Sequence, residues 1–128
     1  MAKILVAEDE KQIGDMIAFK LGNSGHQVVR APDGEQALRL ASRELPDLIL
    51  LDAMMPGVGG FEVLRRLKGD SSLRAIPVIM VTAKGHERDV LNGLRGGAVD
   101  YIVKPFSLKE LSARVELALR REPPAIQL

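Results

Sequence analysis

Short runs of apolar residues alternate along the chain with longer segments in which apolar residues recur at helical spacing. The apolar runs predict five β-strands, at residues 3–8, 26–31, 47–52, 76–82 and 99–104. Several of these runs are apolar at consecutive positions, as is typical of parallel strands that are buried on both faces. We therefore expect a sheet that lies between two layers of helices.

Five amphipathic segments separate and follow these runs. In each segment the apolar residues lie three or four positions apart, so that on a helix they form one stripe that we expect to face the sheet. The stripes consist of Ile13, Met16, Ile17 and Leu21; Ala37, Leu38 and Ala41; Phe61, Leu64 and Leu67; Val90, Leu91 and Leu94; and Leu108, Leu111, Val115 and Leu119. Before the last stripe, Ser107 and Glu110 have the spacing of a capping box, which marks the start of a helix.

The strand–helix order, repeated five times, predicts an α/β fold. We expect a doubly wound (βα)5 sandwich with a five-stranded parallel sheet and right-handed crossovers. The common strand order at this size is 2-1-3-4-5, that of the flavodoxin-like folds. Residues 1–121 are expected to form this domain. Residues 122–128, which begin near Pro123 and Pro124, are expected to be a C-terminal tail or the start of a linker.

Composition narrows the class of protein. The 128 residues fit one domain, and a formal net charge of +1, from 18 basic and 17 acidic residues, gives no electrostatic reason to expect nucleic acid or a membrane as a partner. There is no cysteine, so neither disulfides nor thiol chemistry are expected. No apolar run approaches the ~20 residues that span a bilayer. We expect a cytoplasmic protein.

Polar residues stand at the carboxyl ends of four predicted strands. Glu8 and Asp9 follow the first strand, Asp52 ends the third, Thr82 ends the fourth and Lys104 ends the fifth. In doubly wound sheets, ligands bind at this edge, near the switch in strand order. Three carboxylates that meet there repel one another unless a cation lies among them. The sequence therefore predicts a site with room for a metal ion beside the lysine.

The residue types at this edge suit phosphoryl transfer. A small set of oxygen ligands, with room for water, favours Mg2+ over Ca2+. Aspartate is a known phosphoryl-accepting nucleophile, and a metal, an ammonium and a hydroxyl would bind the phosphoryl oxygens. The hypothesis from the residues is therefore Mg2+-assisted phosphorylation of Asp52.

Each of these residues also has a plainer interpretation when taken alone. Asp52 could cap a turn, Glu8 and Asp9 could be acids at a helix N-terminus, and Thr82 and Lys104 could be ordinary strand-end residues. Only their coincidence at one edge of the sheet favours a functional site.

Other conspicuous residues have structural interpretations. The glycines of the segment after Asp52 predict a flexible turn, because the lysine and spacing of a phosphate-binding loop are missing; they are Gly57, Gly59 and Gly60. The methionines Met54, Met55 and Met80 are expected to pack in the core. His26 and His86 have no partner at metal-binding spacing, and no role is assigned to them.

Four segments resemble the receiver domain of response regulators in two-component signalling. They are "KILVAEDE", "PDLILLDAMMPGVGGFEVLRRLK", "IPVIMVTAK" and "GAVDYIVKPFSLKEL", which stand in the order and spacing of the family and extend over residues 3 to 121. The sequence is most similar to the receivers of the winged-helix transcription-factor subfamily.

The resemblance implies a role for each residue at the strand ends. Asp52 would accept the phosphoryl group, and Glu8, Asp9, Asp52 and the main-chain carbonyl of Met54 would hold Mg2+. Lys104 would pair with a phosphoryl oxygen or, without phosphate, with Asp52.

The resemblance also implies a switch. Thr82 would bond the phosphoryl group on activation, and Tyr101 would turn inward when Thr82 moves. The bond between Lys104 and Pro105 is expected to be cis, a state that costs little before proline.

The partners that the resemblance implies are a histidine kinase or a histidine phosphotransfer protein. Phosphorylation would reshape the face formed by the fourth helix, the fifth strand and the fifth helix, and this face is a candidate for homodimer formation. Asp100, Glu110 and Arg114 match charged positions of that dimer face, but Val90 and Val99 replace other charged residues, so the face is incomplete.

Two positions near the site tune the phosphoryl lifetime in this family. They carry Met54 and Lys84, and neither is an acid or amide suited to position an attacking water. We therefore expect slow self-dephosphorylation. The protein would be a signalling switch, not a metabolic enzyme, although it catalyses its own phosphotransfer.

Two alternatives belong to other classes. An aspartyl-phosphate phosphatase of the haloacid dehalogenase type needs a second aspartate two residues after the nucleophile, where this chain has Met54, and usually carries a cap domain. A receiver-like module that binds partners without phosphorylation would not need the full set of site residues.

Overall fold

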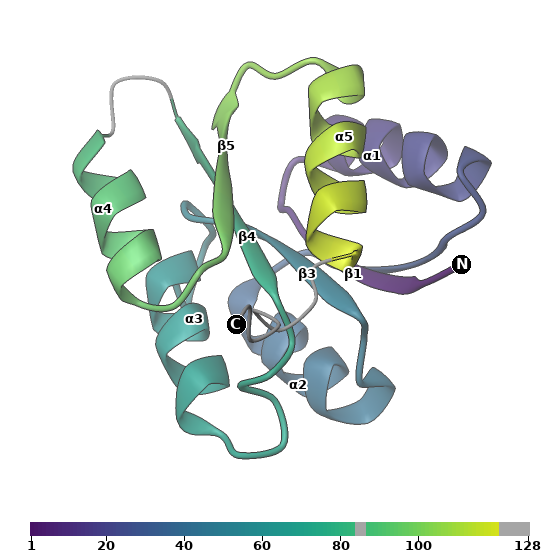
Figure 1. Ribbon diagram of the computed structural model, residues 1–128. Helices are drawn as coiled ribbons and strands as arrows, with labels where there is room; N and C mark the ends of the chain where they lie inside the picture. The colour runs from purple at the N-terminus through teal and green to yellow at the C-terminus, as the bar shows by residue number, and fades with distance from the viewer. Residues whose placement is uncertain (84–86, 121–128) are drawn as a thin grey trace, which may run out of the picture.

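The computed structural model describes residues 1–83 and 87–120, apart from the side chains of Glu87 and Asp89 (Figure 1). Strands and helices alternate from β1 to α5. Their bounds are β1 Lys3–Ala7, α1 Lys11–Asn23, β2 Gln27–Ala31, α2 Gly34–Glu44, β3 Leu48–Asp52, α3 Gly60–Gly69, β4 Val78–Ala83, α4 Glu87–Arg95, β5 Asp100–Lys104 and α5 Leu108–Leu119.

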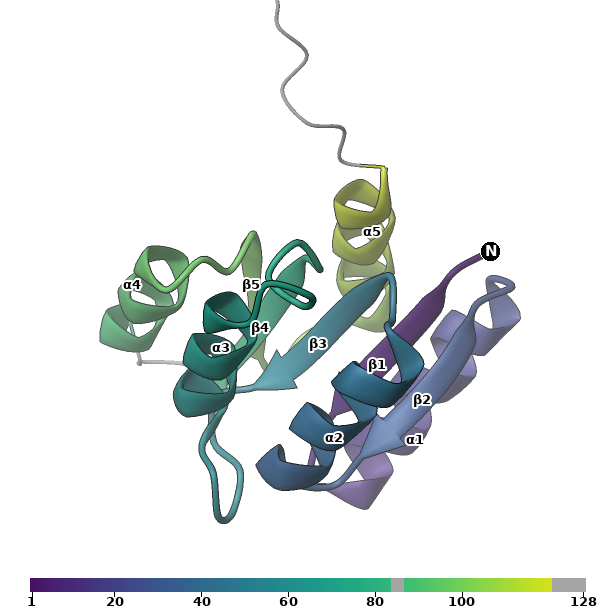
Figure 2. The same cartoon turned by 90° about the horizontal axis from the view of Figure 1, so that it is seen from below.

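The sheet has five parallel strands in the order β2-β1-β3-β4-β5. Helices α1 and α5 cover one face, and α2, α3 and α4 cover the other (Figures 1 and 2). Because the order changes direction between β1 and β3, the carboxyl ends of these two strands face the crevice where such folds bind ligands. The predicted fold and strand order are confirmed.

Strand β3 shows why the sheet is buried on both faces. Leu48 and Leu50 belong to the apolar cluster between the sheet and helices α1 and α5. Ile49 and Leu51 belong to the apolar cluster on the other face, between the sheet and helices α2 and α3. Adjacent side chains of a strand point to opposite faces, so a strand between two helical layers must be apolar at every position. The continuous apolar run thus holds Asp52 at the end of a central strand.

The predicted stripe of α4 is wrong. Leu91 and Leu94 are 53% and 43% exposed. The helix instead approaches the sheet through Gly93, where a Cβ atom would lie 3.1 Å from Met80 Cγ. The absence of a side chain lets α4 lie close to β4, and its leucines then point away from the core. In α1, Met16 is likewise 50% exposed, although it belongs to the predicted stripe.

The remaining predictions about elements are largely confirmed. The strand bounds differ from the predicted ones by one or two residues, and Ser107 caps α5 by accepting a hydrogen bond from the Glu110 amide. The prediction for residues 122–128 lies outside the described residues. Within the described ranges, none of the helices combines the length and apolarity that a membrane span requires.

Candidate functional site

Three carboxylates meet at the carboxyl ends of β1 and β3. Asp52 is the last residue of β3, and Glu8 and Asp9 follow β1, which pairs with β3 in parallel register up to Ala7 and Leu51. One oxygen from each of the three carboxylates lies within 4.8 Å of the others. Glu8 and Asp52 are buried, and Asp9 is exposed, so the cluster opens to solvent on one side. The structure thus brings the predicted acids together.

Lys104 closes the other side of this cluster. Its ammonium lies 2.9 Å from Asp52 Oδ2 and 3.1 Å from Glu8 Oε1. Burial works against the charge of Lys104, but its hydrogen bond and charge interaction with Asp52, and then those with Glu8, raise its pKa above the ordinary value. Lys104 is therefore a cation held against one oxygen of Asp52, Oδ2. The bond between Lys104 and Pro105 is cis, as expected.

The carboxyl group of Glu8 has a raised pKa. Burial, followed by the charge of Asp52, raises the pKa of Glu8 from 4.5 to about 7, even though the Glu10 amide and Lys104 act in the opposite direction. The carboxylates of Glu8, Asp9 and Asp52 outnumber the one ammonium of Lys104. A divalent cation would balance the remaining negative charge, and the oxygen donors and the open side suit Mg2+.

Two backbone amides orient the carboxylates. The Met54 amide donates a hydrogen bond to Asp52 Oδ1 at 2.9 Å, and the Glu10 amide donates one to Glu8 Oε2 at 3.1 Å. Asp52 thus has one oxygen on Met54 and the other on Lys104, so its rotamer is fixed from both sides. The Met54 side chain is 62% exposed, and the prediction that it packs in the core is wrong, whereas Met55 and Met80 are buried as predicted.

The Thr82 hydroxyl is buried at the end of β4. Its Oγ1 atom has no hydrogen-bond partner among the described residues, and the residue is 1% exposed. Strand β4 pairs with β3 so that Asp52 lies opposite Val81, next to Thr82. A buried hydroxyl without a partner is unfavourable, and such groups are often kept for a ligand.

Tyr101 lies on the same sheet face as Thr82. In the parallel register, Met80 pairs with Tyr101 and Thr82 pairs with Val103, so these side chains project to one side of β4 and β5. Tyr101 is half-buried and packs against the apolar cluster between the sheet and helices α2 and α3. This placement puts the threonine and the aromatic ring on one continuous surface.

The glycines between β3 and α3 differ from the predicted flexible turn in one respect. Gly57 has φ of +75°, which fits the predicted turn. Gly60, in contrast, is the first residue of α3, and a Cβ atom there would lie 2.2 Å from the carbonyl oxygen of Asp52. Gly60 is therefore required by the close approach of α3 to the phosphoacceptor candidate, and not by flexibility.

Glu10 is a site residue that the sequence analysis did not single out. Its Oε1 atom lies 3.6 Å from the ammonium of Lys104. The sequence feature that could have pointed to Glu10 is its place as the third acid in "AEDE", because residues that follow the end of a strand lie at the same edge of the sheet.

Residues away from the site include pairs that the sequence did not predict. The side chain of His26 is 5% exposed, and its ring lies between the Ala2 amide, at 3.1 Å, and a Glu116 oxygen, at 2.6 Å, so it does have a structural role. His86 and Lys84 lie outside the described residues.

The charged residues of the candidate dimer face interact within one chain. Arg114 donates hydrogen bonds to both carboxylate oxygens of Asp100, at 2.9 and 3.0 Å, and one to Glu110 at 3.2 Å.

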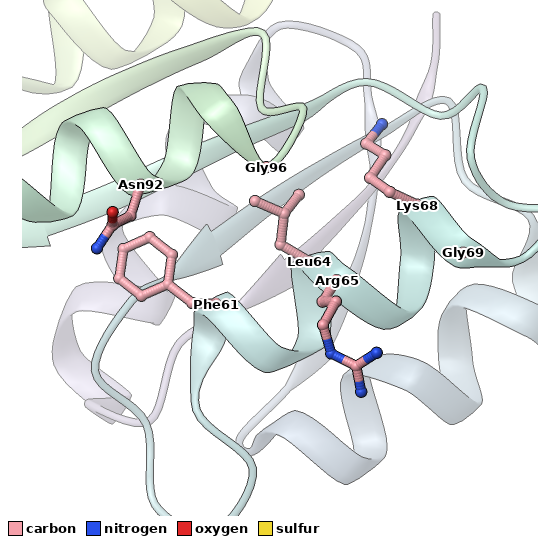
Figure 3. Close-up of a pocket in the computed structure, with 7 residues that line it drawn as sticks. All are labelled: Phe61, Leu64, Arg65, Lys68, Gly69, Asn92 and Gly96. Atoms are coloured by element: carbon pink, nitrogen blue, oxygen red, sulfur yellow. The ribbon is translucent and has the colours of Figure 1, made fainter.

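A separate hollow lies between α3 and α4 (Figure 3). Its floor is apolar, formed by Phe61 and Leu64, and its volume is about 520 Å³. Arg65 on its rim pairs with Glu62, and Lys68 binds two backbone carbonyls of the following loop. None of the strand-end residues lines this hollow.

The comparisons with known proteins agree on one family. The family model described as "Response regulator receiver domain" matches residues 4–116. The phosphate regulon transcriptional regulatory protein PhoB of Escherichia coli (strain K12) is 48% identical over 122 residues, which cover 95% of this chain and 53% of that protein. The alkaline phosphatase synthesis transcriptional regulatory protein PhoP of Bacillus subtilis (strain 168) is 46% identical over 93% of this chain and 49% of that protein. The chain spans about half the length of these curated relatives.

Solved structures give the same result. The receiver domain of the Francisella response regulator 1452 matches with a TM-score of 0.88 and 36% identity, covering 94% of this chain and 98% of that one. The chemotaxis protein CheY4 of Vibrio cholerae matches with a TM-score of 0.86 and 30% identity, covering 92% and 98%.

Proposed function

Because the chain belongs to the response regulator receiver domain family of two-component systems, we propose that it is a phosphorylation-driven switch whose phosphoacceptor is Asp52. The observation that carries the proposal is the arrangement of Asp52 between the ammonium of Lys104 and the carboxylates of Glu8 and Asp9. A strand-end aspartate needs neither a fixed cation nor two further acids for structural reasons.

The proposed reaction is a displacement at phosphorus. A carboxylate oxygen of Asp52 attacks the phosphorus atom, and the bond from phosphorus to the donor breaks, with its electrons leaving on the donor. Lys104 is held 2.9 Å from Asp52 Oδ2, so it can follow the negative charge from the carboxylate to the phosphoryl oxygens. The Met54 amide keeps Asp52 in one rotamer for attack.

Mg2+ is the proposed cofactor. Glu8, Asp9 and Asp52 would hold it, with the main-chain carbonyl of Met54 as a further ligand. The ion would neutralise charge on the phosphoryl oxygens. Burial, followed by the charge of Asp52, raises the pKa of Glu8, and a cation bound between these carboxylates would favour their ionised forms.

Thr82 and Tyr101 are the proposed switch residues. The unpartnered hydroxyl of Thr82 would gain a hydrogen bond from binding a phosphoryl oxygen, which favours any conformation that brings it closer to Asp52. Movement of Thr82 would free space on the sheet face that Tyr101 shares, and the ring would turn inward. The affected surface is that of α4, β5 and α5.

The proposed phosphoryl donor is a histidine kinase or a histidine phosphotransfer protein. The two curated relatives named above, PhoB and PhoP, are transcriptional regulatory proteins, so control of an output domain is the proposed purpose of the switch. The receiver itself, proposed to comprise residues 1–121, would not contact nucleic acid directly.

Slow self-dephosphorylation is a further part of the proposal. The exposed side chain of Met54 is apolar and cannot position a water molecule for attack on the phosphoryl group. A phosphoryl half-life of seconds in the purified protein would contradict this point.

The experiment is incubation with Mg2+ and acetyl phosphate, followed by intact-mass measurement. We expect one acid-stable but hydroxylamine-labile phosphoryl adduct on the wild type, and none on Asp52→Asn or without Mg2+. Lys104→Ala serves as a test of the cation, and its labelling should be weaker. An unmodified wild type would contradict the proposal and favour a module that acts without phosphorylation. Multiple turnover on small phosphoesters would instead favour the phosphatase.

A further inference from the structure

Glu10 is an acid near the site for which the proposed phosphotransfer has no use. It is the N-cap residue of α1, but its side chain makes no capping hydrogen bond. Its Oε1 atom lies 3.6 Å from the ammonium of Lys104, and its side chain is 62% exposed. The fold therefore gains no cap from this side chain.

Glu10 is the exposed carboxylate among the three that contact the ammonium of Lys104. The other two, those of Glu8 and Asp52, have side chains only 2% and 4% exposed. The Lys104 side chain is itself 20% exposed. In the proposed function, a donor places anionic oxygens next to this ammonium, and hence near the Glu10 carboxylate.

We propose that Glu10 is an electrostatic rim residue that slows the entry of small dianionic phosphoryl donors. It acts through its negative charge beside Lys104, and it touches neither the phosphorus atom nor the nucleophile, so it is a specificity-determining and not a catalytic residue. The inference rests on the proposed function, because it concerns the rate of phosphorylation of Asp52. A protein donor would hold its phosphoryl group in place by a docked surface, and would be less sensitive to one rim charge.

The expected size follows from Coulomb's law in water. A dianion about 6 Å from a unit charge feels a repulsion that slows its reaction roughly threefold to tenfold at low ionic strength. A monoanion at the same place is slowed roughly twofold to threefold. At about 1 M salt the Debye length shrinks to about 3 Å, and both effects should largely vanish.

The test compares phosphorylation rates of the wild type and Glu10→Gln at saturating Mg2+. Acetyl phosphate, a dianion at neutral pH, and phosphoramidate, which carries one net negative charge, are the two donors. We expect Glu10→Gln to react roughly three to ten times faster with acetyl phosphate, with a smaller gain for phosphoramidate and nearly none at high salt.

Two further variants separate rim charge from other causes. Glu10→Asp keeps the charge on a shorter arm, so its rates should stay near those of the wild type. Glu116→Gln removes a partly exposed acid that pairs with His26 near the start of β1, at the opposite end of the sheet, and should change neither rate. Thermal unfolding of all variants verifies that they are folded.

The possible outcomes separate a failure of the rim-charge proposal from a failure of the proposed phosphorylation of Asp52. If the wild type is not labelled at all, the proposed function fails. If the wild type is labelled but Glu10→Gln is no faster, if Glu10→Asp is as fast as Glu10→Gln, or if Glu116→Gln gains as much, only the rim-charge proposal is overturned.

Discussion

The hydroxyl of Thr82 shows how a single atom can be poised for a ligand. It is buried without a partner among the described residues, at the end of a strand whose preceding residues are apolar and buried. A fold selected only for stability would carry valine there, because valine has the same shape and no polar atom to bury. In the proposed switch, a hydrogen bond that forms only on phosphorylation would offset the cost of burying this hydroxyl.

Thr82→Val should accordingly stabilise the unphosphorylated protein. We expect the free energy of unfolding to rise by about 1 kcal/mol, because the unpaired buried hydroxyl disappears. Urea denaturation followed by circular dichroism measures this change. A loss of stability would mean that the hydroxyl already has a partner, such as a water molecule, and that it is not held in reserve.

The pKa of Glu8, at about 7, would make the proposed binding of Mg2+ depend on pH. Since the folded state holds this proton more tightly than the unfolded chain, Glu8 lowers the stability of the metal-free protein progressively as the pH rises from about 4.5 to about 7. Mg2+ needs the ionised carboxylate, so its binding releases the proton. Affinity for Mg2+ should be about tenfold weaker at about pH 6 than at about pH 8.

Titration calorimetry in two buffers of different ionisation enthalpy measures both the affinity and the number of protons released. Glu8→Gln is the matched control, since it keeps the shape and cannot titrate; its affinity should be lower and nearly independent of pH over this range. An equal pH dependence in the variant would assign the proton to another group.

At the residue scale, the sequence predicted which side chains meet but not their surroundings. Asp52, Glu8, Asp9 and Lys104 could be placed together because parallel strands end at one edge. The proximity of Glu10 to Lys104 depends on how α1 starts, and the exposure of Met54 depends on the path of one loop. Neither detail is encoded in hydrophobic periodicity.

At the scale of elements, the close approach of α3 to β3 fixes the position of the phosphoacceptor candidate. The Gly60 amide donates a hydrogen bond to the carbonyl of Ala53 at 3.1 Å, and the Gly60 Cα faces the backbone of Asp52. A side chain at this position would push the start of α3 away from the strand end. The helix therefore braces the backbone on which Asp52 stands.

Gly60→Ala should destabilise the protein by about 1–3 kcal/mol, because the added methyl group overlaps backbone atoms that cannot move aside. Phosphorylation should also slow, since the carboxylate of Asp52 would be misplaced. Denaturant unfolding and labelling with acetyl phosphate measure the two effects.

Gly69→Ala is the control within the same helix. A Cβ atom there has no neighbour within 4 Å, so we expect a gain of up to about 1 kcal/mol from helix propensity and no change in labelling. Equal effects of the two substitutions would show that the close approach at Gly60 is not what matters.

Helix α4 shows where periodicity misleads. Its apolar stripe suggested a buried face, but Gly93 packs on β4 and the leucines face outward. Periodicity records where large apolar side chains lie; it cannot tell whether they face the core or another molecule. An exposed stripe on the element that flanks β5 is instead consistent with an interaction surface.

At the scale of the whole molecule, α4, β5 and α5 form one end of the domain, because β5 is the edge strand and the two helices flank it (Figure 1). Leu91 and Leu94 are exposed on α4. Leu117 is 64% exposed on α5, three positions after Arg114 and thus on the same helix face. Exposed apolar side chains therefore lie on the two helices that flank β5, and one of these helices, α5, also carries charged residues of the candidate dimer face.

We predict that beryllium fluoride with Mg2+, which mimics the phosphoryl group, converts the monomer into a concentration-dependent dimer through this end. Leu94→Glu should keep the protein monomeric, because it places a charge in the apolar contact. Phe19→Glu, on the exposed face of α1, is the matched control and should dimerise like the wild type. Sedimentation velocity at several concentrations measures the fraction of dimer. Equal dimer fractions for the two variants would exclude this end of the domain as the interface.

The overall fold could be predicted because every level of the sequence agreed. Five apolar runs, five amphipathic segments and the capping box before α5 all indicated one topology, and the strand order followed from chain length and class. The pairing of Arg114 with Asp100 within the chain could not be predicted in this way, because a surface arginine has several acids within reach.

In the proposed switch, Asp52 itself carries the phosphoryl group. Borohydride reduction of the labelled protein converts an aspartyl phosphate to homoserine, and mass spectrometry of the digested peptides locates the change. We predict homoserine at position 52 and at no other aspartate, and only when Mg2+ and acetyl phosphate were present. Homoserine at Asp9 or at another aspartate, or no homoserine in a labelled protein, would contradict the assignment of Asp52 as the phosphoacceptor.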